Sequence, residues 1–154
     1  MKRQKAILVD LDGTLVNVSS IRHFVEEGHK DFDAFHRASM DCPPNFQVID
    51  RIKHFSAKGF ATVIVSGREA KFRRLTEFWI AMWDVPCDDL IMRANGNCKS
   101  DVDVKRNMFH VLKNKFEIVE AIDDRQNLLD MWQELKISRV INVENLLNHD
   151  VQLV

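Results

Sequence analysis

Two aspartates, Asp10 and Asp12, follow the apolar run AILV near the start of the chain. Side chains alternate along an extended chain, so two residues separated by one can point to the same side. Two further aspartates, Asp123 and Asp124, follow another apolar run, IVEAI, far along the sequence. Like charges that lie close together repel and are costly to bury without a cation. A hard divalent ion relieves the repulsion, and Mg²⁺ fits because it leaves ligand positions for water and phosphate oxygens.

Hydroxyl groups and cations also follow apolar runs or lie near the start of a predicted helix. Ser66, Gly67 and Arg68 follow the apolar run FATVIV, and Thr14 follows the first pair of aspartates. Lys105 lies in the first turns of a predicted helix, after the loop NGNCKSD. Backbone N–H groups at glycine turns and helix N-termini favour an anion. Each residue alone has an ordinary explanation as a cap, turn or surface residue, but together a metal ion, cations and hydroxyls around carboxylates indicate a site for a phosphoryl group.

A calcium-binding loop is a different explanation of the first pair of aspartates. An EF-hand loop that begins at Asp10 requires an acid or Asn at its fifth position, Gly at its sixth and Glu at its twelfth. The chain has Thr14, Leu15 and Ile21 at those positions. The sequence therefore excludes this kind of site.

Apolar runs predict the strands that must position these residues. The expected buried strands are 5–9, 60–65, 89–93, 118–122 and 139–143, separated by helical patterns at 46–57, 71–83, 101–114 and 126–135. Alternating strands and helices predict a three-layer, Rossmann-like α/β fold, with a parallel sheet and helices on both faces. Ligands of such sheets bind beyond the carboxyl ends of the strands. The aspartates, Ser66 and Arg68 are therefore expected at one edge of the sheet.

Residues 17–44 interrupt this alternation soon after the first strand. Their pattern predicts two short helices broken at Gly28 and closed by Pro43 and Pro44, which cannot lie inside a helix. We expect a single domain over residues 1–154, in which residues 17–44 form a small helical cap.

Composition limits the classes of function. The chain is 45% hydrophobic and 29% charged with a formal net charge of -1, so we expect a soluble protein without general attraction to nucleic acid or membranes. A small substrate or the end of a polynucleotide remains compatible. No apolar run approaches a signal peptide or the roughly 20 residues of a membrane helix. Cys42, Cys87 and Cys98 form no CxxC pair, which predicts free thiols and a cytoplasmic protein. The sequence does not indicate the oligomeric state.

Four short motifs resemble a known superfamily. DLDGT is similar to the first motif of the haloacid dehalogenase (HAD) phosphotransferases, VIVS to the second, Lys105 to the third and AIDD to the fourth, in the family's order. Over nearly the whole chain, VIVSGRE, DVKRNMF and AIDDRQNLLDMW resemble the 3′-phosphatase domain of bacteriophage polynucleotide kinase/phosphatase and its stand-alone relatives. The phosphate-loop motif GxxxxGK[ST] of the kinase half is absent, so the resemblance implies the phosphatase module alone.

The resemblance implies a mechanism and a HAD-like fold with a minimal cap. Asp10 attacks phosphorus and forms an aspartyl-phosphate. Asp12 donates a proton to the leaving hydroxyl and later takes one from the hydrolytic water. Mg²⁺ lies between Asp10, the backbone carbonyl of Asp12, Asp123 and the phosphate, and Asp124 helps through water or by orienting its neighbours.

The resemblance also implies groups that bind the phosphate. Lys105 and Ser66 hold it, and Arg68 and Asp101 belong to the same site. Asp101 lies four residues before Lys105, so an i,i+4 ion pair is expected to hold the lysine. For Arg22, in the cap, a substrate contact and an ordinary surface position both stay open. The expected site comprises the catalytic residues Asp10, Asp12 and Lys105, the metal ligands Asp10, Asp12, Asp123 and Asp124, and the binding residues Thr14, Ser66, Gly67, Arg68, Asp101 and Arg22.

The substrate stays open between three hypotheses. The first is a Mg²⁺-dependent polynucleotide 3′-phosphatase acting on DNA or RNA ends, favoured because a short cap leaves the site open to a polymer. The second is a phosphatase of small molecules such as nucleotides. Relatives tend to carry an acid and an arginine where this chain has Asn97 and Lys99, which leaves the preferred end undecided. The third, a phosphate-binding protein without catalysis, has no need of a nucleophile such as Asp10.

Overall fold

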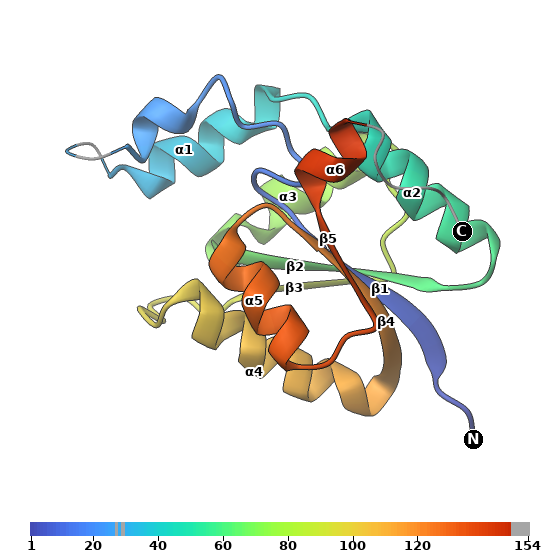
Figure 1. Ribbon diagram of the computed structural model, residues 1–154. Coiled ribbons are helices and arrows are strands. Elements are labelled where there is room, and N and C mark those ends of the chain that lie inside the picture. Colours follow the sequence, from blue (N-terminus) through green and yellow to red (C-terminus); the bar gives the residue numbers. More distant parts are fainter. Residues whose placement is uncertain (27, 29, 149–154) are drawn as a thin grey trace.

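A five-stranded parallel sheet forms the centre of the computed structural model, which describes residues 1–26, 28 and 30–148. The strands are β1 (Gln4–Asp10), β2 (Ala61–Glu69), β3 (Asp89–Arg93), β4 (Phe116–Asp123) and β5 (Arg139–Asn142), in the order β3-β2-β1-β4-β5. Helices cover both faces of this sheet (Figure 1). The predicted three-layer α/β architecture is confirmed, and β1 lies at its centre because its apolar run is buried on both faces.

The helices divide between the two faces of the sheet. Helices α2 (Phe46–Ala57), α3 (Arg73–Met82) and α6 (Val143–Leu147) pack on one face, and α4 (Asp101–Lys115) and α5 (Gln126–Glu134) pack on the other (Figure 1). Alternate residues of β1 supply the two cores: Ile7 and Val9 face the first group, and Ala6 and Leu8 face the second. The period of two along the central strand therefore builds two separate apolar layers.

Strand β2 is longer than the apolar run predicts. Pairing with β3 continues through a change of register between Ser66 and Glu69, so the strand passes Ser66 and ends at Glu69. This irregular stretch buries Arg68 at the carboxyl end of the sheet. The predicted helix at 71–83 is divided into a 3-10 turn, Ala70–Phe72, followed by α3.

The end of the fifth strand also differs from the prediction. Strand β5 ends at Asn142, and Val143, expected as its last residue, begins the unpredicted helix α6. The side chain of Asn142 accepts a hydrogen bond from the backbone N–H of Glu144 and so caps this helix. Other bounds agree closely, since α2 and β3 begin and end where the sequence predicts.

The cap segment, residues 17–44, is less helical than predicted. Its described part contains a 3-10 turn, Arg22–Phe24, the helix α1 (Phe32–Ala38) and a second 3-10 turn, Ser39–Asp41. Residues 27 and 29 of this segment, and residues 149–154 of the predicted domain, lie outside the described residues. The segment extends past the end of the sheet (Figure 1), and its side chains line a cavity with Asp10 and Asp12.

Two expectations about the chain as a whole can be compared with the structure. Within the described ranges Cys42, Cys87 and Cys98 are all free thiols, as predicted. No helix in this part of the chain has the length and apolar character needed to cross a membrane.

Candidate active site

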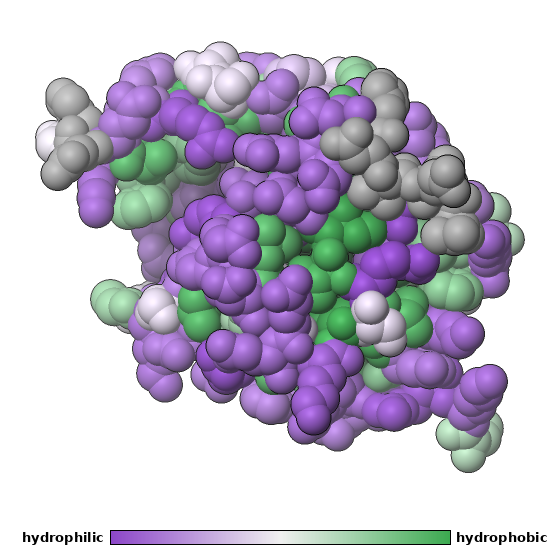
Figure 2. Space-filling view, viewed as in Figure 1, coloured by the Kyte–Doolittle hydropathy of each residue, from purple (hydrophilic) through white to green (hydrophobic). Residues whose placement is uncertain are grey.

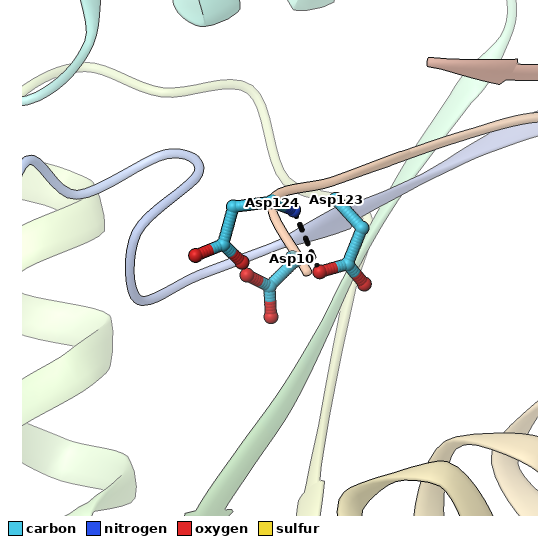
Figure 3. Close-up of side chains that lie close together, drawn as sticks. All are labelled: Asp10, Asp123 and Asp124. Carbon is cyan, nitrogen blue, oxygen red and sulfur yellow. Dashed lines mark hydrogen bonds between the residues drawn. The ribbon is translucent and has the colours of Figure 1, made fainter. Parts of the chain in front are cut away.

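Three aspartates meet at the carboxyl ends of the central strands. Asp10 ends β1, Asp123 ends the neighbouring strand β4, and Asp124 follows it. One oxygen from each carboxylate lies within 4.8 Å of the others, and the side chains converge on one small region (Figure 3). Parallel pairing of β1 with β4 therefore brings together residues that the sequence separates widely, as the strand pattern predicts.

Lys105 is the cation at the centre of this cluster. Its Nζ donates to Asp10 Oδ1 at 2.5 Å and to Asp123 Oδ2 at 3.2 Å. It projects from α4, whose N-terminus is capped by the side chain of Ser100. Burial opposes the charge on Lys105, but Asp10 and Asp123 outweigh it and raise the pKa of the amine above its ordinary value. The ammonium therefore stays charged at neutral pH.

The carboxylates outnumber the lysine, and this excess changes their acidity. Burial, together with the charge of Asp123, raises the pKa of Asp10 well above its ordinary value although Lys105 opposes the shift. Burial and Asp123 also raise the pKa of Asp124. The cluster as it stands holds negative charge that its own lysine does not neutralise.

The turn after β1 fixes the other side of the Asp10 carboxylate. Thr14 Oγ1 donates to Asp10 Oδ2 at 2.9 Å, so both carboxylate oxygens have a donor. The turn passes through Gly13 with φ of +87°, and a Cβ there would collide with the carboxylate of Asp124. The DGT sequence thus combines a left-handed glycine, a close approach of two loops and a hydroxyl donor.

The carboxylate of Asp12 lies outside the three-aspartate cluster and faces Arg68. Arg68 donates from Nε and Nη2 to the two oxygens of Asp12 at 2.9 and 2.6 Å. The guanidinium is buried and also donates to Thr76 Oγ1 and Ser39 Oγ, at 3.0 and 2.7 Å. The backbone N–H of Arg68 donates to Ser66 Oγ at 3.1 Å. The irregular end of β2 therefore holds the side chains of Ser66, Arg68 and Asp12 in place.

His36, in α1, is a neighbour of Asp12 that the sequence did not suggest. Its Nε2 lies 3.8 Å from Asp12 Oδ2, and its ring packs edge-on against Phe35 and Phe72. Burial lowers the pKa of His36 to about 4, so the imidazole is neutral at pH 7. Its Nδ1 is buried and has no hydrogen-bond partner among the described residues. Only the folded position of α1 reveals this residue, because its sequence spacing matches no ligand pattern.

Asp101 lines the same cavity, but the prediction that it pairs with Lys105 is wrong. Lys105 turns toward Asp10 and Asp123, and Asp101 instead forms ion pairs with Arg93 and Arg125. Burial alone would raise the pKa of Asp101, but Arg125, with Lys105 and Arg93, brings it below its ordinary value. An i,i+4 spacing allows two side chains to meet, but buried acids elsewhere bind the lysine more strongly.

Gly67 explains how Asp101 approaches the sheet. A Cβ at Gly67 would stand 2.6 Å from Asp101 Oδ1, so a larger residue would push the carboxylate away. Arg93, at the end of β3, donates to the carbonyl of Gly67 at 2.8 Å and closes the same junction. Arg93 and Arg125 were not predicted as part of this site, although both stand at strand ends, directly after the segments DLIM and IVEAIDD.

Trp132, in α5, contacts the three-aspartate cluster through Asp123. Helical spacing predicts it as a core residue, and it is buried between α5 and the sheet. Its Nε1 donates to Asp123 Oδ2 at 3.1 Å, so it also fixes one of the three carboxylates. Spacing indicates burial but does not indicate which acceptor the indole reaches.

These residues surround a cavity of about 590 Å³ between the strand ends, the cap segment and the loop before α4. Arg22 lines it from the cap, near the turn at Gly13, so the structure places this residue in the site rather than on a remote surface. Asn97 and Lys99, the positions that depart from relatives, line the facing wall. The volume of the cavity is within the range typical of small-molecule sites.

The donor atoms fit a hard divalent cation. The convergent ligands at Asp10, Asp123 and Asp124 are carboxylate oxygens, without a thiol or imidazole in the set. Mg²⁺ prefers oxygen ligands, and its positive charge would favour the ionised carboxylates of Asp10 and Asp124, whose pKa is raised by burial and by the charge of Asp123. The residues present therefore suit the Mg²⁺ ion that the sequence predicts.

Comparison with known proteins identifies the family of the chain. Residues 4–145 match the family model of the polynucleotide kinase PNKP phosphatase domain. A protein of Autographa californica nuclear polyhedrosis virus, whose name is that of a bifunctional polynucleotide kinase/RNA ligase, is 32% identical over 145 residues. That match covers 92% of this chain but 20% of the viral protein, so the chain spans about a fifth of its relative.

Solved structures agree on the fold. A chain of the Pnkp1/Rnl/Hen1 complex superposes with a TM-score of 0.79 and 26% identity, over 92% of this chain and 45% of that one. A class C acid phosphatase from Bacillus anthracis, with tungstate bound, superposes with a TM-score of 0.69 at 12% identity, over 99% of this chain and 81% of that one. The second similarity is one of fold alone.

Proposed function

Because the chain belongs to the family of polynucleotide kinase phosphatase domains, which have a HAD-like fold, we propose that it removes the 3′-phosphate from polynucleotide ends. The reaction depends on Mg²⁺ and passes through an aspartyl-phosphate. The observation that carries the proposal is the setting of Asp10, whose two carboxylate oxygens are held by Lys105 and Thr14 at the floor of a cavity. A buried carboxylate oriented in this way is suited to attack.

Asp10 is the nucleophile of the first step. One of its oxygens forms a bond to phosphorus while the bond from phosphorus to the 3′ oxygen breaks. Asp10, Asp123, Asp124 and the backbone carbonyl of Asp12 would hold Mg²⁺, which supplies positive charge to the carboxylates and the phosphate when bound. Lys105 keeps its proton and screens the attacking carboxylate from the negative phosphate.

Asp12 moves the proton in both steps. It gives a proton to the leaving 3′ oxygen, and then takes one from the water that attacks the aspartyl-phosphate. The products are inorganic phosphate and a 3′-hydroxyl end, and Asp10 is regenerated. Arg68 binds both oxygens of Asp12 and so directs the carboxyl group toward the cavity, while the neutral imidazole of His36 closes the other side.

Groups around the cavity bind the phosphate and the adjoining chain. Ser66 and the backbone near Gly67 offer donors at the end of β2, and Arg22 offers a guanidinium from the cap. Asp101 positions Arg93 and Arg125 on the facing wall, where their charge suits a polynucleotide backbone. The polymer substrate is further supported by the relatives, which are a polynucleotide kinase/RNA ligase and a member of an RNA repair complex.

A phosphatase of nucleotides is the second candidate. The cavity of about 590 Å³ is large enough for a mononucleotide, and the same acids and lysine would carry the reaction. The two candidates therefore differ in the substrate beyond the phosphate and not in the chemistry.

Release of inorganic phosphate tests the proposal. The substrates are 3′- and 5′-phosphorylated oligonucleotides and 3′- and 5′-mononucleotides, each with Mg²⁺ and with EDTA. Wild type is compared with Asp10→Asn and with Asp103→Asn, a matched change at an exposed carboxylate of α4. We expect Mg²⁺-dependent release from the 3′-phosphorylated oligonucleotide, lost in Asp10→Asn and retained in Asp103→Asn.

Other outcomes would change the function. Release mainly from mononucleotides would move the function to nucleotide hydrolysis with the same residues. Absence of release from every substrate, with the fold intact, would leave a phosphate-binding protein.

A further inference from the structure

The cap segment gives the cavity an apolar wall. Val18, Val25, Phe32 and Phe35 line this side, whereas the facing loop before α4 and the strand ends contribute charged and amide groups. Figure 2 shows a notch at the left of the molecule, with apolar side chains on its upper side, where the cap segment lies in Figure 1. A phosphoryl group and a divalent ion gain nothing from apolar surface. The wall therefore fits a different part of the ligand.

Phe32 is the exposed aromatic side chain of this wall. It begins α1 and is 55% exposed, whereas Val18 and Phe35 are buried. Exposed large apolar side chains of the described residues are Met1, Phe32, Phe46, Phe78, Met82 and Val111, and among them Phe32 lines the cavity. A single exposed phenylalanine is ordinary, but this ring continues an apolar surface inside a polar site.

Phe32 lies on the side of the cavity where the leaving group must be. Its ring centroid is 6.4 Å from that of His36, and His36 Nε2 is 3.8 Å from the carboxylate of Asp12. Asp12 is the residue that gives its proton to the leaving oxygen in the proposed reaction. Lys105 and the three aspartates stand on the phosphate side. The aromatic ring is therefore near the group that carries the leaving oxygen.

The chemistry of that group indicates what the ring contacts. In a polynucleotide 3′ end, the leaving oxygen belongs to a ribose or deoxyribose, and the base attached to this sugar is a flat aromatic surface. Stacking of a base on an aromatic side chain tolerates every sequence, because each base has a π-face. A phenylalanine without a hydrogen-bonding group suits an enzyme that must accept any terminal base.

Resting on the proposed function, we propose that Phe32 stacks on the base of the terminal nucleotide and thereby makes the enzyme prefer nucleoside 3′-phosphate ends to phosphomonoesters without a base. The strand ends recognise the phosphate, and the cap segment recognises the nucleoside. Phe32 is in this role a specificity residue and takes no part in bond breaking.

The test compares phosphate release from substrates with and without a terminal base. The substrates are a 3′-phosphorylated oligonucleotide, the same oligonucleotide with an abasic tetrahydrofuran at its last position, a 3′-mononucleotide and glycerol 2-phosphate. The variants are Phe32→Ala, Phe32→Tyr and Phe46→Ala. Phe46 is a matched control because it also begins a helix, is 56% exposed, and packs against Trp83 outside the cavity.

We expect Phe32→Ala to lower kcat/KM for the oligonucleotide and the 3′-mononucleotide about tenfold to a hundredfold, mainly through KM. Its kcat/KM for the abasic oligonucleotide and glycerol 2-phosphate should equal that of wild type. Phe32→Tyr retains a stacking ring and should restore the base-containing substrates, and Phe46→Ala should match wild type throughout.

Each contrary result has its own meaning. Equal losses in Phe32→Ala with and without a base would overturn the stacking proposal and leave the 3′-phosphatase function intact. Wild type that hydrolyses glycerol 2-phosphate but none of the nucleotide substrates would overturn both proposals. Wild type that is active on oligonucleotides with no difference between Phe32→Ala and Phe46→Ala would overturn the stacking proposal alone.

Discussion

Strand β4 carries two buried clusters of charge on its opposite faces. On one face, Glu120 accepts hydrogen bonds from Arg51 at 2.6 and 2.8 Å and from Arg139 at 2.6 Å. The two guanidinium groups also lie over the ring of Phe55, with centroid distances of 5.2 and 5.4 Å. On the other face, near the end of the strand, Asp123 lies beside Asp10 (Figure 3). Lys105 donates a hydrogen bond to each of these two carboxylates.

The two clusters differ in whether cations of the protein compensate their carboxylates. Glu120 has arginine donors on both of its oxygens, so the buried carboxylate is satisfied by the protein alone. Around Lys105 the carboxylates are in excess, and burial together with the charge of Asp123 raises the pKa of Asp10 and Asp124. In the balanced cluster around Glu120 the protein itself compensates the carboxylate, which indicates a structural role. In the unbalanced cluster around Lys105 the carboxylates are in excess in a cavity, which suits an added cation and a reacting group.

The largest expected effect comes from removing the acid of the balanced cluster. Glu120→Gln leaves the buried guanidinium of Arg51 and the partly exposed guanidinium of Arg139 beside a neutral amide. We expect the free energy of unfolding to fall by about 3–5 kcal/mol, as is typical when one partner of a buried ion pair is removed. Urea unfolding at neutral pH measures this change, and phosphate release per folded molecule should stay at the wild-type level.

Glu117→Gln is the control for this change, because Glu117 lies on the same strand and is only half-buried. It should alter the free energy of unfolding by less than about 0.5 kcal/mol. If Glu120→Gln abolished phosphate release while leaving stability unchanged, the assignment of this cluster to structure would be wrong.

The next effect comes from the cation of the unbalanced cluster. Lys105→Met leaves the carboxylates of Asp10 and Asp123 without their ammonium partner. We expect a loss of about 3 kcal/mol in EDTA at neutral pH, and loss of phosphate release in all conditions. Saturating Mg²⁺ should restore much of the stability, because the ion replaces the missing positive charge.

Unfolding curves with EDTA and with Mg²⁺ measure this difference. Lys113→Met, a change at an exposed lysine of the same helix, controls for the substitution itself. A Mg²⁺-induced stabilisation of Lys105→Met no larger than that of wild type would argue against a cation site beside this lysine.

The sequence was sufficient to predict most of the unbalanced cluster. Asp10, Asp123 and Lys105 stand at the ends of strongly apolar strands or in the first turns of a helix, and parallel sheets bring such positions together. The same pattern predicted the strands and the order of layers, since alternation of buried runs with helices allows few arrangements.

The sequence could not predict which side chains pair with one another, because tertiary packing determines these partners. Asp101 binds Arg93 and Arg125 instead of Lys105, because Lys105 turns toward more deeply buried acids. His36 reaches Asp12 through the placement of α1, which no spacing rule determines. The balanced cluster around Glu120 was likewise unpredicted, since a glutamate within a strand usually indicates an exposed face.

A smaller effect concerns how the protein holds the unbalanced cluster in place. Trp132→Phe removes the indole N–H that donates to Asp123 Oδ2 at 3.1 Å. A hydrogen bond to a charged acceptor contributes about 2 kcal/mol, and we expect a loss of that size with weaker stabilisation by Mg²⁺. Trp79→Phe is the matched control, because Trp79 is equally buried but donates to the carbonyl of Cys42.

The Trp79 variant should lose about 1 kcal/mol, as is usual for a neutral acceptor, and should respond to Mg²⁺ like wild type. Thermal unfolding of the two variants across a Mg²⁺ titration gives both quantities. Equal Mg²⁺ responses would mean that Trp132 supports the core alone and leaves the metal-binding acids unaffected.

The smallest expected change in the free energy of unfolding is an increase. It distinguishes the cluster around Lys105 most directly from the cluster around Glu120. Asp124→Asn removes a carboxylate that burial and Asp123 make unfavourable. In EDTA at neutral pH, the free energy of unfolding should rise by about 1 kcal/mol, whereas the comparable change at Glu120 lowers it. The stabilisation that Mg²⁺ gives should become smaller, because one of its ligands is lost.

The pH dependence gives the sign of this effect independently. A carboxyl group whose pKa is raised by folding favours the folded state while it is protonated, below its ordinary pKa of 3.8, and loses this contribution as pH rises through the folded value. The gain in Asp124→Asn should therefore be absent in acid and grow toward neutral pH. Asp50→Asn, at an exposed position of α2, should show no such trend. A gain in Asp124→Asn that is constant with pH would show that the charge of this carboxylate is not what destabilises the metal-free protein.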